Sequence, residues 1–474
     1  MSRSTESWLL VGSGPGVLAL AERLSAHGRR VTVLNPQRQW GGVFAGTVLE
    51  GETFDNGMTN FEFELFGDPQ ADLASYHPES KDSIGKYVHF VRAYLQRFVT
   101  THEVPCPQML WDGQLHPDLL ISNRFEVIAA LSPALKASMT GELRNIAGAP
   151  APHRLHARHK AEDPATFVRH SFEEVSLANH GPTFHRLFVA PLFEKVLGVP
   201  TAQVPALFHR SGWSPLFYPE TLLSQLGPEP HVLKRTVFHY PDDSHFGAFL
   251  GRLVEAVRAR PSARIVEGAT DLSIDAGRRV VTTAQGHFEY DRLVWGGDLA
   301  PLAAIGAPAA GSAPAPEPAA RASLRLTFLR VRREGLRDHV SVLLDPDPAA
   351  PFYRVTNQSL SSARDPAIHQ LILECNSDRW QSAPGTDEEK LDAALARYGI
   401  ERAAVVSRDH RTFGKALAIP SAAQLQRFNA RRAELARALP DVAWIGPGSG
   451  YASVTLNDQM IQALQIAHAH EVLD

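Results

Sequence analysis

The sequence predicts an α/β fold in which two domains are interleaved. With 474 residues, the chain exceeds what one compact core usually holds. Its first residues show the strand, turn, helix and strand pattern of a Rossmann-like nucleotide-binding unit. Segments that could complete this unit come only much later in the chain, after a long stretch of different pattern. An α+β domain with a helical insertion is therefore expected to be threaded through the first domain.

The opening unit is predicted from hydrophobic periodicity. Residues 8–11 are a short apolar run typical of a buried strand. Residues 17–27 then repeat apolar side chains at helical spacing until Gly28 ends the pattern. Residues 30–34 alternate again and end at Asn35. This length suits a parallel crossover unit, so a parallel sheet is expected to begin at the N-terminus.

The turn between the first strand and the first helix is rich in glycine. It consists of Gly12, Ser13, Gly14, Pro15 and Gly16. Glycines let the backbone approach a pyrophosphate closely, and the helix N-terminus offers N–H groups that have no partner within the helix. A tight turn without a ligand would give the same local sequence. The placement between strand and helix favours dinucleotide binding.

Later segments return to the first domain and outline the second. Helical patterns such as residues 84–98 and 184–197 predict a helical insertion within residues 83–209. A helix at 249–259 and a strand at 290–295 suggest a return to the first domain, and residues 307–320 are almost all Ala, Pro, Gly and Ser, as in a linker. Further strands are expected at 324–331, 340–344, 371–374 and 442–445, and a last helix at 458–470. These patterns divide the chain into a nucleotide domain of residues 1–70, 231–300 and 425–474 and a substrate domain of residues 71–230 and 301–424.

The segments that follow the second strand resemble those of a known family. Gly41 and Gly42, followed by Phe54-Asp55-Asn56-Gly57, are similar to the double glycine and the aromatic-Asp-x-Gly segment of flavin amine oxidases. Protoporphyrinogen oxidases and UDP-galactopyranose mutases are similar to these. The resemblance continues in residues 191–198, 352–356 and 446–460. It implies that the nucleotide domain binds FAD, with the double glycine by the pyrophosphate and the tail loop by the flavin ring.

The resemblance and the glycine turn together nominate the site residues. Cofactor contacts are expected from Gly12, Gly14, Pro15, Gly16, Asn35, Arg38, Gly41, Gly42, Gly57, Thr59, Asp271, Gly446, Ser453 and Val454. Substrate contacts are expected from Arg354, Tyr353, Asn357, Tyr218 and Tyr240. Arg354 leads this group because it follows Tyr353 on a strand-like run and matches an arginine of the resembling family. The alternative is an exposed strand arginine. No catalytic residue is assigned.

The chain departs from the pattern at several polar positions. Position six of the glycine fingerprint is Val17, and the second strand ends in Asn35 where an acidic residue usually binds the ribose. A neutral acceptor is weaker by about 1 kcal/mol. In the tail, Pro447 and Asn457 stand where relatives of the mutase kind have Arg and Asp, and Thr59 replaces a frequent histidine. FAD binding is therefore a hypothesis that a flavin spectrum tests.

Asn35 allows a second account. Together with Arg38 it could accept the 2′-phosphate of NADP, but the double glycine speaks against this. A solvated surface position or a pyrophosphate contact is the favoured explanation of Arg38.

Composition excludes several classes of partner. The formal charge is −4, and no long run of Lys or Arg offers a surface for nucleic acid. Cys106 and Cys375 stand far apart, which predicts no disulfide framework and fits the cytoplasm. His153, His156 and His159 lack a recognised metal-ligand spacing, so no metal is expected. Neither a signal peptide nor a membrane-spanning segment is predicted.

Three functions remain open on this basis. The first is an FAD-dependent oxidoreductase that removes hydride from a C–N, C–C or C–O bond of a small metabolite. The second is a non-redox flavoprotein similar to UDP-galactopyranose mutase. The third is a flavin-fold protein whose altered contacts no longer hold FAD, and which acts as a cofactor-free enzyme or as a binding partner in a biosynthetic assembly. No motif identifies the substrate or the oligomeric state.

Overall fold

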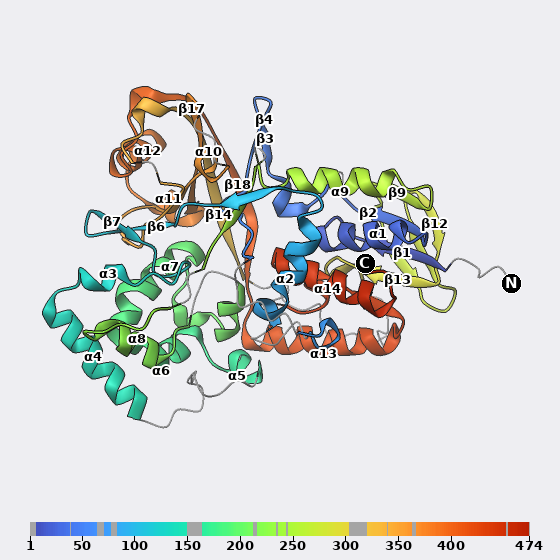
Figure 1. Ribbon diagram of the computed structural model, residues 1–474, viewed down its shortest axis with the longest axis horizontal. Helices are drawn as coiled ribbons and strands as arrows, with labels where there is room; N and C mark the ends of the chain where they lie inside the picture. Colours follow the sequence, from blue (N-terminus) through green and yellow to red (C-terminus); the bar gives the residue numbers. More distant parts are fainter. Residues whose placement is uncertain are drawn as a thin grey trace.

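The computed structural model describes residues 6–37, 39–63, 71–76, 83–148, 164–211, 216–233, 236–242, 245–302, 320–338, 340–362, 366–451 and 454–473. Two bodies are visible in Figure 1. One is built on a parallel sheet and holds both ends of the described chain, and the other combines a large mixed sheet with a group of helices. The predicted interleaved α/β fold is confirmed.

A five-stranded parallel sheet forms the centre of the first body. Its order is β19 (Val442–Trp444), β13 (Arg292–Trp295), β1 (Ser7–Val11), β2 (Arg30–Asn35) and β9 (Ala263–Glu267). Every neighbouring pair is parallel. Alternate side chains of β1 enter different cores, with Trp8 and Leu10 on one face and Leu9 and Val11 on the other. This explains why the strand reads as a continuous apolar run.

Different elements cover the two faces of this sheet. One face carries α1 (Pro15–Ala26), α2 (Ser83–Leu95), α9 (Ala248–Arg258) and α14 (Leu456–Ala469). The other carries α13 (Ala422–Ala438) and a small antiparallel sheet of β10 (Ser273–Asp275), β11 (Val280–Thr283) and β12 (Gly286–Glu289). The sequence patterns did not indicate α13. The predicted domain boundaries stay a prediction. Helix α2 follows residue 70, the predicted end of the first nucleotide-domain segment, but it packs against α14 of the first body.

A seven-stranded mixed sheet forms the second body. Its order is β18 (Val405–Ile419), β14 (Ala320–Arg332), β17 (Ile368–Asn376), β16 (Phe352–Asn357), β15 (Val342–Leu344), β6 (Gln108–Trp111) and β7 (Gln114–Pro117). The last two strands come from the segment predicted to be largely helical. Asp112 and Gly113 connect β6 to β7, and both have positive φ, as in a type I′ hairpin turn. The Asp-Gly pair is therefore a hairpin signal that the helical prediction for this segment did not take into account.

Helices pack on this sheet around an aromatic core. They are α3 (Glu126–Ala129), α4 (Pro133–Gly148), α5 (Pro164–Arg169), α6 (Phe172–Phe184), α7 (Ala190–Leu197) and α8 (Pro219–Leu226). The core shared by α3, α4, α6, α7 and α8 includes Phe184 and Phe193 and reaches Tyr353 of β16, whereas Phe167 of α5 lies in a separate small core. The remaining strands and α-helices are the hairpin of β3 (Thr47–Leu49) and β4 (Glu52–Phe54), the antiparallel pair of β5 (Thr101–Glu103) and β8 (His239–Pro241), which are far apart in the sequence, and the helices α10 (Gln358–Ser361), α11 (Ser377–Ser382) and α12 (Asp387–Arg397).

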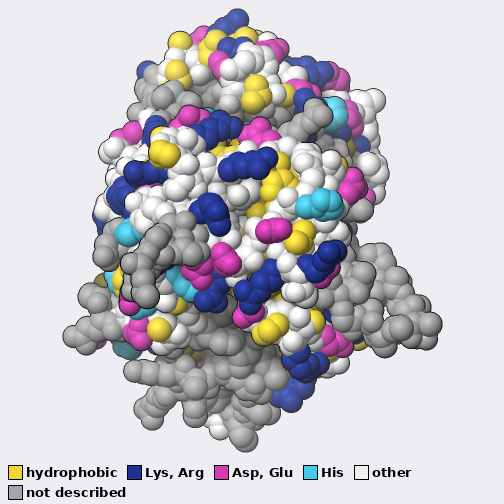
Figure 2. All heavy atoms as spheres, turned by 90° about the vertical axis from the view of Figure 1, so that its right-hand side faces the viewer, with side chains coloured by type: hydrophobic (Ala, Val, Ile, Leu, Met, Phe, Trp, Pro, Cys, Tyr) yellow, Lys and Arg dark blue, Asp and Glu magenta, His cyan; other side chains and the backbone are white. Residues whose placement is uncertain are grey.

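The surface of the first body mixes charges of both signs. On the face in Figure 2, Lys and Arg side chains are interspersed with Asp and Glu. Arginines of this body form ion pairs such as Arg258 with Glu267 and Arg279 with Asp441. In the described part of the chain, no helix has both the length and the apolar character that crossing a bilayer requires.

Candidate functional site

The glycine turn connects β1 to α1 at the carboxyl edge of the parallel sheet. Gly12 has φ 141°, a conformation that favours glycine, and its N–H donates to the Leu34 carbonyl at 2.9 Å. Gly14 is the N-cap of α1 and Pro15 its first residue, and no side chain caps the helix. The first amides of a helix have no acceptor within it. The turn therefore presents uncapped N–H groups, as anion-binding helix termini do.

Gly16 has a packing role. A Cβ at this position would lie 2.4 Å from the Gln459 carbonyl oxygen and 2.8 Å from Ile445 Cγ2, so only glycine lets α1 approach α14 this closely. A Cβ at Gly14 would lie 2.6 Å from the Gln459 side-chain oxygen. Close packing of the first helix is the usual task of the last fingerprint glycine. Here that glycine stands one place earlier, which accounts for Val17 at position six.

The end of β2 carries a buried amide with one unused donor. Asn35 is fully buried, and its Oδ1 accepts the Gln37 N–H at 2.9 Å. Its Nδ2 has no hydrogen-bond partner in the described structure. Such an orphan is rare and costs free energy unless a ligand or water accepts the bond. Gln37 in turn contacts the Ser13 hydroxyl at 3.4 Å, so the strand end borders the glycine turn.

The tail segment adds two further unpaired amide atoms. Gly446, at φ 70°, donates its N–H to Gln462 Oε1 at 2.6 Å. Within the described structure, Gln462 Nε2 and Asn457 Oδ1 are buried without partners. Val454 is exposed, and its carbonyl accepts the Gln459 amide at 3.1 Å. Neutral amides thus replace the charged groups of the resembling family.

A buried carboxyl lies beside this tail. Burial, followed by the charge of Asp458, raises the pKa of Glu62 to about 7. Asn457 Nδ2 approaches the Glu62 carbonyl oxygen at 3.5 Å. The site therefore has a group near α14 that can hold or release a proton close to neutral pH.

Three predicted cofactor positions fall outside this cluster or outside the described structure. Asp271, with φ 56°, is exposed on the loop before β10. Arg38 and Ser453 are not among the described residues, nor are His153, His156 and His159.

The double glycine joins the nucleotide turn to the second body. Gly41 and Gly42 have φ of 90° and 56°, and the Gly41 N–H donates to the Ser13 carbonyl at 2.7 Å. A Cβ at Gly41 would lie 2.2 Å from Leu250 of α9. Gly57 has φ 98°, and a Cβ there would lie 2.7 Å from Glu374 Oε2 on β17. These glycines bring the nucleotide loops against the mixed sheet.

Asp55 organises the segment between these loops. Its carboxylate accepts the Tyr240 hydroxyl at 2.5 Å and the Phe246 N–H at 3.0 Å. Burial raises the pKa of Asp55 to about 6, although the hydrogen bonds from the Tyr240 hydroxyl and the Phe246 N–H act in the opposite direction. Tyr240, predicted to contact substrate, is 1% exposed and holds this carboxyl. The hydroxyl of Thr59, predicted to contact the cofactor, is buried without a hydrogen-bond partner among the described residues.

A cavity of about 720 Å³ lies between the double-glycine loop and the mixed sheet. Gly42, Tyr353 and Arg354 all line it, so the structure brings these predicted cofactor and substrate residues together. Gln37, which contacts Ser13, lines the same space. The cavity is therefore continuous with the surroundings of the glycine turn. Its size is typical of small-molecule sites.

Arg354 is held by a glutamate that the sequence patterns did not reveal. Its Nε and Nη2 donate to the two oxygens of Glu374 at 2.5 and 2.7 Å, and the Tyr353 hydroxyl donates to the same carboxylate at 3.1 Å. Burial would lower the pKa of Arg354, but the charge and hydrogen bonds of Glu374 outweigh it and raise that pKa further. With 17% of its side chain exposed, Arg354 is not a solvated strand arginine.

The other two predicted substrate residues lie elsewhere. Asn357 caps α10 through the Leu360 N–H at 3.2 Å, and its amide nitrogen contacts His369 at 3.1 Å. Tyr218 precedes α8 and packs beside a small core that contains Phe167. Neither is among the residues that line the 720 Å³ cavity. Their predicted substrate contacts stay a prediction.

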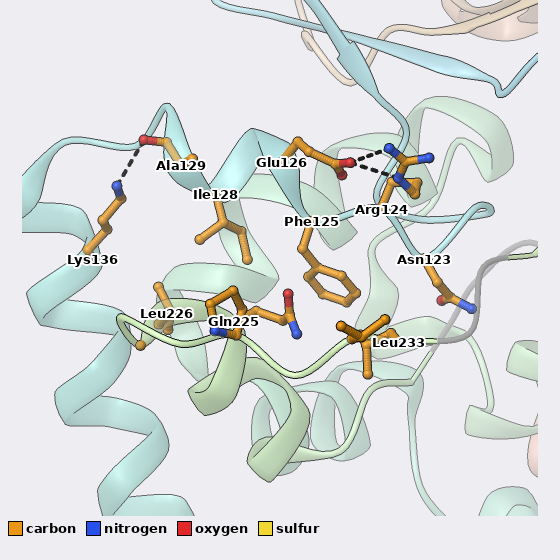
Figure 3. Close-up of a pocket in the computed structure, with 13 residues that line it drawn as sticks. Asn123, Arg124, Phe125, Glu126, Ile128, Ala129, Lys136, Gln225, Leu226 and Leu233 are labelled. Atoms are coloured by element: carbon orange, nitrogen blue, oxygen red, sulfur yellow. Dashed lines mark hydrogen bonds and ion pairs between the residues drawn. The ribbon is translucent and has the colours of Figure 1, made fainter.

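A second cavity, of about 450 Å³, opens among the helices (Figure 3). Phe125, Ile128 and Leu233 form its apolar lining. The nearby charges are satisfied, since Arg124 pairs with Glu126 and the Lys136 ammonium donates to the Ala129 carbonyl at 2.9 Å. In Figure 1 the labelled α3 and α8 lie across the molecule from α1, so this cavity is separate from the glycine turn.

Comparisons with known proteins agree with this architecture. Residues 10–71 match the family model of an NAD(P)-binding Rossmann-like domain. The structure of reduced UDP-galactopyranose mutase is similar, with a TM-score of 0.67 and 17% identity over 98% of this chain and 96% of that one. No curated protein matches the chain in sequence.

Two amine oxidases share the fold as well. Cyclohexylamine oxidase from Brevibacterium oxydans IH-35A has a TM-score of 0.57 and 13% identity, covering 99% of this chain and all 100% of that one. Putrescine oxidase bound to putrescine has a TM-score of 0.59 and 13% identity, covering 99% of each chain. The predicted resemblance is thereby confirmed for the fold, which extends over nearly the whole length of each chain.

Proposed function

We propose that this chain is an FAD-dependent oxidoreductase acting on a small molecule. The observation that carries the proposal is the uncapped glycine turn between β1 and α1, whose Ser13 contacts Gln37 in the wall of a cavity large enough for a substrate. The fold shared with a mutase and with amine oxidases supports it. When bound, FAD would supply the acceptor for a hydride, a capacity that the side chains themselves lack.

The residues present fit such a cofactor through neutral contacts. The uncapped amides of α1 suit a diphosphate, and the free Asn35 Nδ2 suits a ribose oxygen. The unpaired Oδ1 of Asn457 and Nε2 of Gln462 would form hydrogen bonds with other polar groups of the cofactor. Each charged contact replaced by a neutral one weakens binding by about 1 kcal/mol, so affinity is expected to be moderate.

The chain's own groups would handle substrate placement and the proton. Aliphatic side chains of the cavity exclude water, which strengthens electrostatic interactions inside it. Arg354 and Glu374 form the polar anchor in its wall. Oxidation of a substrate by bound FAD would also release a proton, which one of the chain's own groups would take up. Glu62 lies beside the tail segment that the resemblance assigns to the flavin ring, burial raises its pKa to about 7, and it is proposed as the acceptor of that proton.

A flavin spectrum tests the proposal. The purified chain is dialysed with FAD, and the visible flavin bands are expected to remain with the protein and to bleach when a substrate is added without oxygen. A spectrum without bands, before and after the addition of FAD, would contradict the proposal. It would favour the cofactor-free alternative. The structural observation in favour of that alternative is the Gln459 side chain, which lies beside Gly14.

A substitution at Asn35 tests the ribose contact separately. Asn35→Asp keeps the oxygen that accepts the Gln37 N–H and gives the ribose hydroxyls a charged acceptor, so FAD should bind tighter by about 1 kcal/mol, roughly fivefold. Asn123→Asp makes the same chemical change in the helical body and should leave FAD affinity unchanged. Equal affinities for all three proteins would remove Asn35 from the site.

A further inference from the structure

The wall of the 720 Å³ cavity is mostly apolar on the side away from the double glycine. Leu192 and Val196 come from α7, Leu324 and Leu326 from β14, and Phe413 and Leu417 from β18. The cavity is also lined by Gln39, by Thr47 of β3 and by Asn56, which are polar but uncharged. Surfaces of this kind favour an apolar ligand with few hydrogen-bonding groups.

The charges among the described lining side chains cancel. They are Arg354 and Glu374, joined by two hydrogen bonds in a fork geometry. In a bidentate pair of this kind, the positive charge of Arg354 and the negative charge of Glu374 neutralise each other. In the described part of the lining, an ionised ligand would therefore find no unpaired counter-charge to offset the loss of its hydration, which is strongly unfavourable.

We propose that this cavity takes an uncharged, largely apolar small molecule with one hydrogen-bonding group directed at the Arg354–Glu374 pair. This inference rests on the proposed function, whose substrate class it names. It also argues against a sugar nucleotide as the substrate, because a diphosphate needs several unpaired cations. The non-redox alternative similar to the mutase is thereby disfavoured for this chain.

Three naphthalene probes that differ in charge test whether the cavity prefers an uncharged ligand. The protein, equilibrated with FAD, is titrated near neutral pH with 2-naphthol, 2-naphthoate and 2-naphthylmethylammonium by isothermal calorimetry. The neutral probe should bind at least about tenfold more tightly than either ion. Equal or tighter binding of an ion, or no binding of 2-naphthol up to its solubility limit, would overturn the proposal.

Two charge-changing variants locate the effect. Glu374→Gln leaves Arg354 uncompensated and should raise the affinity for 2-naphthoate by about tenfold, whereas Arg354→Gln should do the same for the ammonium probe. In both variants the affinity for 2-naphthol should stay within about twofold. Melting curves confirm that the variants fold. A loss of all three affinities in parallel would indicate a structural role alone and would contradict the proposal.

The same samples separate this inference from the proposed function. Bound flavin together with a preference for 2-naphthoate would overturn the substrate class and leave the FAD proposal intact. A preference for 2-naphthol without any flavin bands would overturn the FAD proposal and leave the inferred preference for an uncharged ligand intact.

Discussion

At the scale of single residues, what surrounds a glycine decides its importance more than its place in a motif. Gly16 and Gly251 both lie in helices. A Cβ at Gly16 would meet the backbone of Gln459 at 2.4 Å, whereas a Cβ at Gly251 would have no neighbour within 4 Å. The two positions therefore form a matched pair for measuring the packing of α1 on α14.

Alanine substitutions at this pair should have opposite signs. Gly16→Ala is expected to lower the free energy of unfolding by about 1–3 kcal/mol, because backbone must move to admit the methyl group. Gly251→Ala should raise it by about 0.5–1 kcal/mol through helix propensity. Urea denaturation of both variants measures this. A neutral Gly16→Ala would show that the contact between the two helices adjusts freely.

Asp55 gives a prediction for pH. Its pKa of about 6 lies above the ordinary value of 3.8, so the folded state favours the protonated form. Its stabilising contribution is complete below pH 3.8 and is lost as the pH rises through 6. The Tyr240 hydroxyl limits this loss by donating to the ionised carboxylate. Tyr240→Phe should therefore cost about 1 kcal/mol more at high than at low pH.

Unfolding of the wild type and of Tyr240→Phe at pH values of about 5 and 8 checks this difference. Tyr94→Phe serves as a comparison, because Tyr94 also donates to a buried carboxylate of the first body, that of Glu22. A Tyr240→Phe penalty that does not depend on pH would show that Asp55 stays in one protonation state.

The sequence predicted local features of the site better than its long-range pairs. The glycine turn and the double glycine are short segments whose spacing can be recognised in the sequence. In the structure, the Gly41 N–H donates to the Ser13 carbonyl. Glu374 was missed because its partner Arg354 stands 20 residues away. Asp55 was recognised as part of the aromatic-Asp-x-Gly segment, but its hydrogen bond with Tyr240, 185 residues away, was not predicted. A buried carboxylate leaves no periodic signal, so only the fold reveals it.

At the scale of elements, α7 is anchored by a buried lysine. The Lys195 ammonium is fully buried and donates to the carbonyls of Asp345 and Asp347 at 2.7 and 2.8 Å. Burial lowers its pKa to about 8, while the charge of Asp345 opposes that shift. This contact fixes α7, which lines the substrate cavity through Leu192 and Val196, against the chain that follows β15.

Lys195→Met should destabilise the protein by about 2–5 kcal/mol, since it leaves two buried carbonyl oxygens without their donor. Asp345 keeps its ion pair with Arg397. Lys136→Met removes a more exposed ammonium from a single carbonyl and should cost about 1 kcal/mol or less. Thermal and denaturant melts compare the two variants. Similar small effects would mean that water replaces Lys195.

Elements with a regular pattern were predicted well, and those defined by turn chemistry were not. The predicted helix at 249–259 is α9, and the predicted strand at 371–374 lies within β17. The helix α13 was missed because Arg, Gln and Asn break up its apolar stripe, of which Leu425 and Leu435 are buried. Strands β6 and β7 are short and partly exposed, so their apolar period is weak.

At the scale of the whole molecule, the first body depends on the last residues of the chain. The edge strand β19 pairs with β13, and α14 contributes Met460, Ile461 and Leu464 to the core beneath the parallel sheet. These side chains are fully buried. The first body therefore cannot complete its core from its N-terminal segments alone.

Truncation after Asp441 should therefore prevent the first body from folding. The shortened chain is expected to lose its cooperative unfolding transition and to be cleaved by protease within the β1–α1–β2 segment, since the loss of a core helix far exceeds the usual stability margin. Circular dichroism and limited proteolysis measure this. A truncated chain that melts at the temperature of the full chain would contradict it.

The strand order also has a consequence for biosynthesis. Strand β19 is the last of the sheet to leave the ribosome, although its neighbour β13 is made about a third of the chain earlier. Until translation ends, β13 presents an unpaired edge to the crowded cell. Nascent chains with such long-range pairing fold slowly and need protection from aggregation. Production of this protein is therefore expected to depend on chaperone supply and on slow synthesis at low temperature.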